Sequence, residues 1–371
     1  MTAPIHYTIQ EIAKICKAKW ISKNDLSSVL SYVSLDSRKI SYPSETAFFA
    51  VKSKSGDANL FLENVFQKGV RNLVTDNESI DPAKFPDANI LLVNNTVSAL
   101  QRLAAFHRSQ FSKQNLTVIG LTGSNGKTIV KEWLNQLLEK DFSIVRSPKS
   151  FNSQIGVPLS VLHTSAQNDL AIFEAGISQP GEMRNLEAII KPQIGIFTNI
   201  GNAHNEGFKN IRQKIREKLL LFKDAACMVF PSGDQRLLKE IQFFQKNNNQ
   251  LQLFSWGTSA DDILKIISIK KESSFSEITA EYNKTKFRIK IPFTDNASIE
   301  NAINCWCTLF ILNKNTKSIR ERFWSLYPIE MRLELKAGIN RCNLINDSYS
   351  NDLSSLRIAL DFLEHQKQHP G

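Results

Sequence analysis

The glycine-rich segment Gly123-Ser-Asn-Gly-Lys-Thr128 constrains the fold of this chain more than any other feature. It directly follows a short apolar run, Leu116 to Leu121, and directly precedes a segment with helical spacing, Thr128 to Glu139. A strand, a glycine-rich turn and a helix in this order are typical of a phosphate loop, in which backbone N–H groups and the helix N-terminus surround phosphate oxygens. Two residues separate the first glycine from the Gly-Lys pair instead of the usual four, so the loop is a shortened variant. A turn that only begins a helix is the alternative; we favour phosphate binding because strand, Lys-Thr pair and helix are all present.

Polar side chains near this loop have the chemistry of a nucleotide site. Lys127 can reach the β- and γ-phosphates of a nucleotide, and the Thr128 hydroxyl can hold Mg²⁺. Glu174 ends one apolar run and His204 follows another. Because ligands bind at the carboxyl edge of open α/β sheets, we expect both residues beside the loop. Taken alone, His204 would be interpreted as an ordinary loop residue, and only its position next to the other candidates favours a metal ligand.

The order of the apolar runs predicts the fold class. After residue 116, short apolar runs alternate with helical segments, which is typical of a mostly parallel sheet covered by helices on both faces. Two-residue alternation over 265–293 predicts antiparallel strands at one edge. Helical spacing predicts helices over 58–68, 97–111, 128–139, 209–223, 299–312 and 354–364. The chain therefore divides into a small N-terminal α/β domain (1–111), a central phosphate-loop domain (112–327) and a third segment (328–371) that is too short to hold a core alone.

Composition and charge exclude several classes of protein. Apolar residues make up 42% and charged residues 22% of the chain, which is ordinary for a globular protein. No apolar run approaches the about 20 residues that span a bilayer, and the first ten residues lack the pattern of a secretion signal. We therefore expect a cytoplasmic protein without membrane insertion. The net charge of +10 suits phosphate-rich ligands, but the basic residues are spread along the chain, so nucleic acid is not an expected partner.

Several motifs, in order along the chain, resemble the Mur ligase family, the ATP-dependent amide-forming ligases of peptidoglycan precursor synthesis. They are TGSNGKT at 122–128, FEAG at 173–176, NIGNAHNEGF at 199–208, EKLLLF at 217–222 and NDSYSN at 346–351. Within the family, residues 34–51, 151–162 and 332–363 resemble the member that adds D-alanyl-D-alanine to a UDP-N-acetylmuramoyl tripeptide. The resemblance covers essentially the whole chain.

The resemblance implies a role for individual residues. It assigns the ATP phosphates to the loop residues Gly123, Ser124, Asn125, Gly126, Lys127 and Thr128. It assigns metal ligation to Thr128, Glu174, His204 and Lys218, the last as a carbamate. Adenine contact is implied for Asn301, and closure over the nucleotide for Arg332 and Asp347. The uridine nucleotide is assigned to Asp36, Ser37 and Arg38, and the substrate loop to Asn152. Spacing alone would make Lys218 a solvated lysine on a charged helix.

The family's chemistry implies ATP and Mg²⁺ as cofactors and an acyl-phosphate intermediate. A carboxylate at the end of the tripeptide attacks the γ-phosphate, and the amine of D-alanyl-D-alanine then displaces phosphate. Both partners of the first step are anionic, so Lys127, the helix N-terminus and two Mg²⁺ ions would supply the positive field. The third segment would be the truncated start of a Rossmann-like domain. A fused alanine racemase domain beyond residue 371, as in some bacteria of the Bacteroidetes type, stays open.

Three alternatives remain at this point. The first is another Mur or folylpolyglutamate-type ligase with a different amino acid. The second is a nucleotide-binding protein without catalysis, although Lys127, Glu174 and Lys218 are all present. The third is a nucleic-acid-dependent ATPase, which should show a hydrolytic Walker-B aspartate and a basic stripe with aromatic residues. Neither feature is evident.

Overall fold

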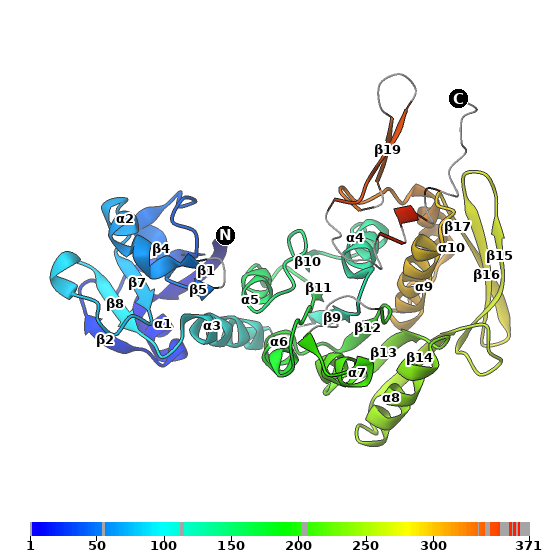
Figure 1. Ribbon diagram of the computed structural model, residues 1–371, viewed down its shortest axis with the longest axis horizontal. Coiled ribbons are helices and arrows are strands. Elements are labelled where there is room, and N and C mark those ends of the chain that lie inside the picture. Colours follow the sequence, from blue (N-terminus) through cyan, green and yellow to red (C-terminus); the bar gives the residue numbers. More distant parts are fainter. Residues whose placement is uncertain are drawn as a thin grey trace. The chain divides into compact units, whose positions relative to one another are not determined.

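The structure of the 371-residue chain is a computed structural model (Figure 1). It describes residues 2–53, 56–111, 115–201, 207–332, 334–337, 342–348, 356–357, 359–360 and 363. Contacts between residues divide the chain into two units. The first comprises 1–116, 145–168 and 188–190, and the second comprises 117–144, 169–187 and 191–371. The division into three domains that is expected from the sequence stays a prediction.

The first unit is built on a six-stranded sheet in the order β1-β3-β4-β7-β8-β2. The four central strands are parallel, and the edge strands β1 and β2 are antiparallel to their neighbours. In sheet order the strands are β1 (Thr2–Thr8), β3 (Val29–Ser34), β4 (Thr46–Phe49), β7 (Asn72–Thr75), β8 (Asn89–Leu92) and β2 (Lys19–Ser22). A separate hairpin joins β5 (Lys52–Ser53) and β6 (Gly56–Asp57). The helices are α1 (Ile9–Cys16), α2 (Leu62–Gln67), α3 (Thr96–Gln110) and α5 (Gly156–Val161).

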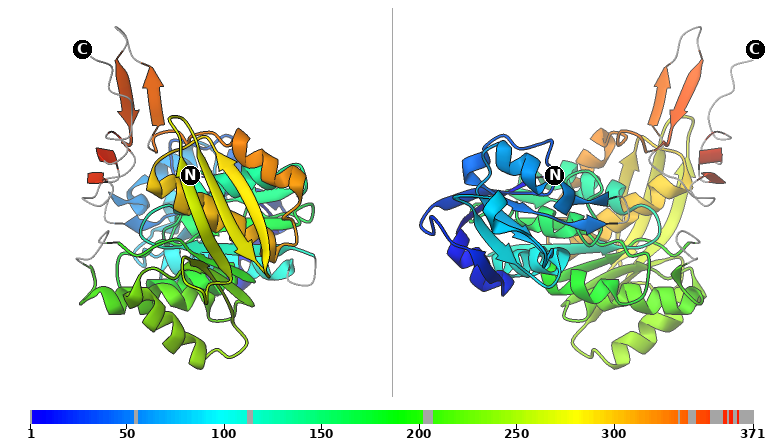
Figure 2. Two further views of the ribbon diagram at one scale, coloured as in Figure 1. Left: turned by 90° about the vertical axis from the view of Figure 1, so that its right-hand side faces the viewer. Right: turned by 60° about the vertical axis from the view of Figure 1, so that its left-hand side comes forward.

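The second unit is built on a larger sheet in which β11, β9, β12, β13, β14 and β15 are parallel. These strands span Leu170–Glu174, Thr117–Thr122, Ile194–Phe197, Cys227–Pro231, Gln252–Gly257 and Leu264–Lys271. Strands β16 (Ser276–Tyr282) and β17 (Thr285–Ile291) continue the sheet in antiparallel orientation (Figure 2). Strand β10 (Ile144–Arg146), where the chain passes out of this unit, is the edge strand next to β11. This arrangement confirms the predicted α/β class with an antiparallel edge.

Helices cover both faces of the second sheet. Ile119 and Leu121 of β9 belong to the same buried cluster as Leu134 of helix α4. Gly120 between them faces the other way, where an added Cβ would lie 3.5 Å from Leu221. Since successive strand residues point to opposite faces, α4 and the segment that follows α7 cover opposite sides of the sheet. The helices are α4 (Lys127–Leu138), α6 (Glu182–Ile190), α7 (Ile211–Leu219), α8 (Gln235–Lys246), α9 (Asn296–Ile311) and α10 (Lys317–Arg322).

Three predicted helices differ in extent from the observed ones. Helix α9, expected over 299–312, begins three residues earlier at Asn296, because the Asp295 side chain accepts a hydrogen bond from the N–H of Ser298 and caps it. The helix expected over 58–68 begins as a 3₁₀ turn, Ala58–Phe61, before α2. The helix expected over 209–223 begins at Ile211, because the Asn210 side chain accepts a hydrogen bond from the N–H of Gln213 and caps it. The helix expected over 354–364 lies largely outside the described residues. No helix in the described ranges is long and apolar enough to cross a membrane.

Candidate functional site

The glycine-rich loop connects β9 to α4, as the sequence predicts, and two of its glycines are required by geometry. Gly123 has φ +145°, and a Cβ there would lie 2.0 Å from the Thr198 hydroxyl oxygen at the end of β12. Gly126 has φ +83°, and a Cβ there would lie 2.3 Å from the Asn301 amide oxygen on α9. Both positions therefore combine a left-handed backbone with close neighbours, which only glycine accommodates.

The segment after β12 holds the loop in place from one side. Asn199 accepts hydrogen bonds from the Ser124 N–H through its carbonyl oxygen and from the Asn125 N–H through its side chain, each at 3.0 Å. The N–H of Gly201 donates to the Ser124 hydroxyl at 2.9 Å. The Thr198 hydroxyl donates to the Asn125 carbonyl at 2.5 Å. The segment after β12 thus holds the loop through four hydrogen bonds.

Three lysines converge on this loop and on the segment that supports it. The Lys127 ammonium donates to the carbonyl oxygens of Gly123 and Ser124 at 2.8 and 3.1 Å, so it lies over its own loop. Lys218 on α7 is buried and donates to the Gly123 carbonyl at 3.1 Å. Lys214, one helical turn earlier, is also buried and donates to the Gly201 carbonyl at 2.6 Å. The structure therefore brings Lys218 to the loop, which the solvated-lysine interpretation would not.

The environment of Lys218 favours its neutral amine. Burial lowers the pKa of Lys218 well below the ordinary value of 10.5, and the positive charges of Lys127 and Lys214 lower it further. A neutral amine is the nucleophilic form of lysine. The lowered pKa therefore favours the form of Lys218 that reacts with an electrophile such as CO₂.

Glu174, at the end of β11, lies beside the start of α4 and has no exposed surface. Its Oε2 accepts a hydrogen bond from the Thr128 hydroxyl at 3.0 Å. Its Oε1 lies 3.0 Å from the ammonium of Lys131, which is equally buried. The Lys131 ammonium also lies 3.0 Å from the Glu132 carboxylate. A buried carboxylate and a hydroxyl, side by side at the loop, are suitable oxygen ligands for a hard cation.

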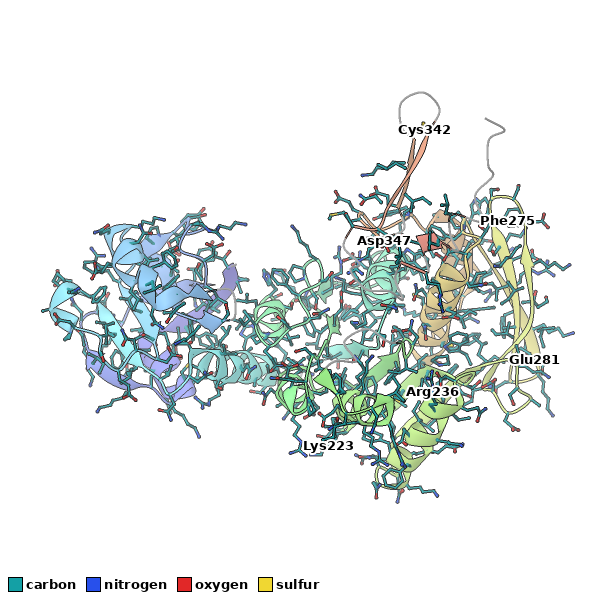
Figure 3. All side chains as sticks on the ribbon, in the orientation of Figure 1. Lys223, Arg236, Phe275, Glu281, Cys342 and Asp347 are labelled. Carbon is teal, nitrogen blue, oxygen red and sulfur yellow. The ribbon has the colours of Figure 1, made fainter. Side chains whose placement is uncertain are left out.

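Two further predicted residues of the second unit are in contact with this group. Asn301 is buried on α9 with its amide oxygen against Gly126, so it supports the loop. A guanidinium nitrogen of Arg332 lies 3.5 Å from the Thr128 hydroxyl. Asp347 directly follows β19 (Asn343–Asn346), at the base of its hairpin with β18 (Glu334–Ala337) (Figure 3). His204 lies outside the described residues.

The remaining predicted residues belong to the first unit. Arg38 forms a two-pronged ion pair with Asp36, at 2.9 and 3.0 Å, and this pair holds the pKa of Asp36 well below its usual range. The Arg38 side chain is 83% exposed. The Ser37 carbonyl accepts from the Lys68 ammonium at 2.6 Å. Asn152 is half-buried, shortly before α5.

The sequence interpretation missed Lys131, Lys214 and Asn199. Lys131 and Lys214 each lie four residues from a predicted residue on the same helix, Lys127 and Lys218 respectively. Residues four apart share a helix face, so this spacing was the signal that could have identified both lysines.

Within the described ranges, no group of three or more His, Cys, Asp or Glu side chains could hold a metal ion.

Comparison with known proteins shows which family the chain resembles. A family model described as the Mur ligase middle domain matches residues 121–309, about half of the chain. The UDP-N-acetylmuramoyl-tripeptide–D-alanyl-D-alanine ligase of Bacillus subtilis is 27% identical, over 97% of this chain and 76% of its own length. The enzyme of the same name from Borreliella burgdorferi is 29% identical, over 89% and 71%.

Solved structures show the same fold. A crystal structure of MurF from Acinetobacter baumannii has a TM-score of 0.87 at 23% identity and covers 98% of this chain and 78% of its own. MurF ligase from Thermotoga maritima in complex with ADP has a TM-score of 0.76 at 22% identity, covering 90% and 74%. The matched family segment contains the phosphate loop, Glu174, Lys218 and Asn301. The chain belongs to the Mur ligase family.

Proposed function

We propose that the chain forms an amide bond at the expense of ATP, adding D-alanyl-D-alanine to a UDP-N-acetylmuramoyl tripeptide and releasing ADP and phosphate. The observation that carries the proposal is the convergence of Lys127, Lys218 and the Thr128–Glu174 pair on one glycine-rich loop. The names of the relatives from Bacillus subtilis and Borreliella burgdorferi support the choice of substrates.

ATP would bind with its phosphates at the loop and at the N-terminus of α4. The partial positive charge of that helix end favours the phosphates. Lys127 would exchange the carbonyl oxygens of Gly123 and Ser124 for phosphate oxygens, since a charged acceptor binds an ammonium more strongly than a neutral one. Asn301, which lies against Gly126, and Arg332, which lies near Thr128, would contact the nucleotide. Asp347 is a third proposed contact.

The residues beside the loop fit Mg²⁺. The Thr128 hydroxyl oxygen and Glu174 Oε2 are 3.0 Å apart. Neighbouring ligands of an octahedral Mg²⁺ ion are about 2.9 Å apart. Thr128 and Glu174 would therefore hold one ion, and His204 and a carbamate on Lys218 are the proposed ligands of a second. Bound there, the ions would neutralise the phosphates that an anionic carboxylate must approach.

The reaction requires the chain to bring like charges together. The terminal carboxylate of the tripeptide attacks the γ-phosphorus, and the bond to the ADP oxygen breaks. Lys127 and the N-terminus of α4 stabilise the charge that develops on the transferred group. The amine of D-alanyl-D-alanine then attacks the carbonyl carbon of the acyl phosphate, phosphate leaves, and the nitrogen loses a proton.

The first unit would supply the uridine-nucleotide site. Arg38, with its guanidinium exposed, and the neighbouring Asp36 and Ser37 are the proposed contacts, and Asn152 is the proposed contact to the muramoyl peptide. A guanidinium suits a diphosphate because it presents several donors in one plane.

Phosphate release from ATP tests the proposal. The UDP-linked tripeptide and D-alanyl-D-alanine are added to the chain singly and together. Release that requires both substrates supports the proposal. Release that instead requires another amino acid assigns the chain to a sibling ligase, and ATP turnover without any acceptor contradicts the ligase reaction.

A further inference from the structure

Lys131 is a charged side chain that the proposed reaction does not use. It lies on α4, one turn after Lys127, and neither it nor Glu174 has any exposed surface. Removing two charges from water is costly, and a well-packed apolar pair is often as stable as a buried ion pair. Stability alone is therefore a weak reason for an ammonium at this position.

The contacts of the pair restrict the Glu174 carboxylate at both oxygens. Oε1 lies 3.0 Å from the Lys131 ammonium, and Oε2 accepts from the Thr128 hydroxyl at 3.0 Å. A quarter turn of the carboxylate about the Cγ–Cδ bond would break both contacts at once. Oε2 is consequently held on the side of the phosphate loop, next to the Thr128 hydroxyl, which is the other proposed ligand of the same metal ion.

Lys131 is itself fixed by a second carboxylate. Glu132, the next residue of α4, lies 3.0 Å from the same ammonium, and its side chain is 19% exposed. The ammonium thus lies between an acid at the edge of the site and the acid inside it. Its long side chain is packed within the protein, so the position of its charge is well defined.

We propose that Lys131 is a positioning residue, which holds Glu174 so that a single oxygen, Oε2, faces the nucleotide-bound metal beside Thr128. The inference rests on the proposed function only in taking Thr128 and Glu174 as metal ligands. Groups that orient a metal ligand typically change metal affinity by about 10- to 100-fold when they are removed. Lys131 would act on the metal and not on the phosphates, which Lys127 and the loop bind.

Binding of ADP, measured by titration calorimetry with Mg²⁺ and with a chelator, separates these two effects without turnover. In the wild type, Mg²⁺ should tighten ADP binding. In Lys131→Met, the tightening by Mg²⁺ should fall by about tenfold or more, while ADP binding without metal stays unchanged. Trp133→Phe is the matched control, since its indole lies on the same helix but contacts Phe293 and the Tyr327 carbonyl. The control should retain the full Mg²⁺ effect.

A double-variant comparison tests whether Lys131 acts through Glu174. If it does, Lys131→Met combined with Glu174→Gln should lose no more of the Mg²⁺ effect than Glu174→Gln alone. The neutral pair also avoids an uncompensated buried charge, so it remains usable if Lys131→Met alone does not fold. In that event Lys131→Arg, which keeps the charge but moves it, should also weaken the Mg²⁺ effect.

Two results would overturn the inference. One is a full Mg²⁺ effect in Lys131→Met or Lys131→Arg. The other is additive losses in the double variant, because these would place Lys131 outside the path through Glu174. Failure of the ligase assay is a separate result: the Mg²⁺ dependence of ADP binding is measured without the muramoyl peptide or D-alanyl-D-alanine, so it can hold when the proposed substrates are wrong.

Discussion

Helices α4 and α6 follow neighbouring strands of one sheet and begin in the same way, yet their N-termini differ in use. Each is preceded by a glycine in the left-handed region, Gly126 at φ +83° and Gly181 at φ +88°. A Cβ at Gly126 would lie 2.3 Å from the Asn301 amide oxygen, whereas a Cβ at Gly181 meets nothing within 4 Å. The two glycines have nearly the same backbone conformation, but only Gly126 is closely surrounded by other atoms.

The charges at the two helix starts are opposite. Helix α6 begins with Glu182, whose carboxylate accepts from the N–H groups of Ser178 and Gln179 at 2.7 and 3.2 Å. Helix α4 begins with Lys127, and Lys218 lies against the same loop. A helix N-terminus favours negative charge. Helix α6 supplies its own negative charge, while α4 begins with the Lys127 cation and is suited to an external anion. The lesson is that surrounding side chains, and not the glycine turn, decide which helix start is suited to bind phosphate.

The largest effect should come from removing the cation that begins α4. We expect Lys127→Ala to lower ATP-dependent phosphate release by about a thousandfold, because the charge on the transferred phosphoryl group loses a direct partner. Circular dichroism should show an intact fold. Lys140→Ala, which removes an exposed lysine just after the same helix, is the control and should leave turnover unchanged. Unchanged turnover in Lys127→Ala would remove the basis for contrasting the two helices.

Lys218 tests whether the loop before α4 depends on a residue from another helix. We expect Lys218→Ala to lower turnover by about a hundredfold and a small carboxylate such as formate to restore part of it, since the acid would replace a carbamate. Lys223→Ala, at an exposed lysine shortly after α7, should behave as the wild type. An active Lys218→Ala variant would return Lys218 to a purely structural role.

The two glycines provide a direct test of enclosure. We expect Gly181→Ala to cost about 1 kcal/mol in the free energy of unfolding, which is the strain of a left-handed alanine. Gly126→Ala should cost more than this and should also weaken ADP binding, because its Cβ displaces Asn301. Denaturant unfolding and ADP titration measure the two quantities. If Gly181→Ala and Gly126→Ala lost equal stability and neither changed ADP affinity, the close packing around Gly126 would have no role in nucleotide binding.

The smallest effect should come from the acid that begins α6. We expect Glu182→Gln to lower the free energy of unfolding by about 1 kcal/mol or less, because it weakens the hydrogen bonds from Ser178 and Gln179. ADP affinity should be unchanged, as this acid belongs to the other helix start. A variant that binds ADP differently would mean that α6 contributes to the nucleotide site.

The sequence predicted the parts of this site that depend on local order. The loop between β9 and α4 and the position of Glu174 at the end of β11 follow from strand-turn-helix patterns and from the rule that parallel strands end at one edge. The parallel strands with an antiparallel edge were likewise predicted from the change in apolar periodicity. These features need only short stretches of sequence.

Pairings between distant segments were not predictable in the same way. The Lys131–Glu174 ion pair joins α4 to β11, and nothing in either segment alone names the partner. Asn199 bonds to the loop across strands, and Asn301 reaches Gly126 from α9. Only the family resemblance pointed to Asn301 and Lys218. Only the three-dimensional structure shows that Lys218 is buried and lies near the charges of Lys127 and Lys214.

Helix α4 carries three of the proposed roles within its first five residues: Lys127 for phosphate, Thr128 for the metal and Lys131 for Glu174. An α-helix turns about 100° per residue. One residue inserted between Thr128 and Lys131 would therefore swing the ammonium away from Glu174 while leaving composition and hydrophobicity almost unchanged. Ile129 and Val130, which lie between these residues and pack in the core, should accept apolar replacements, but the stretch should accept no change of length.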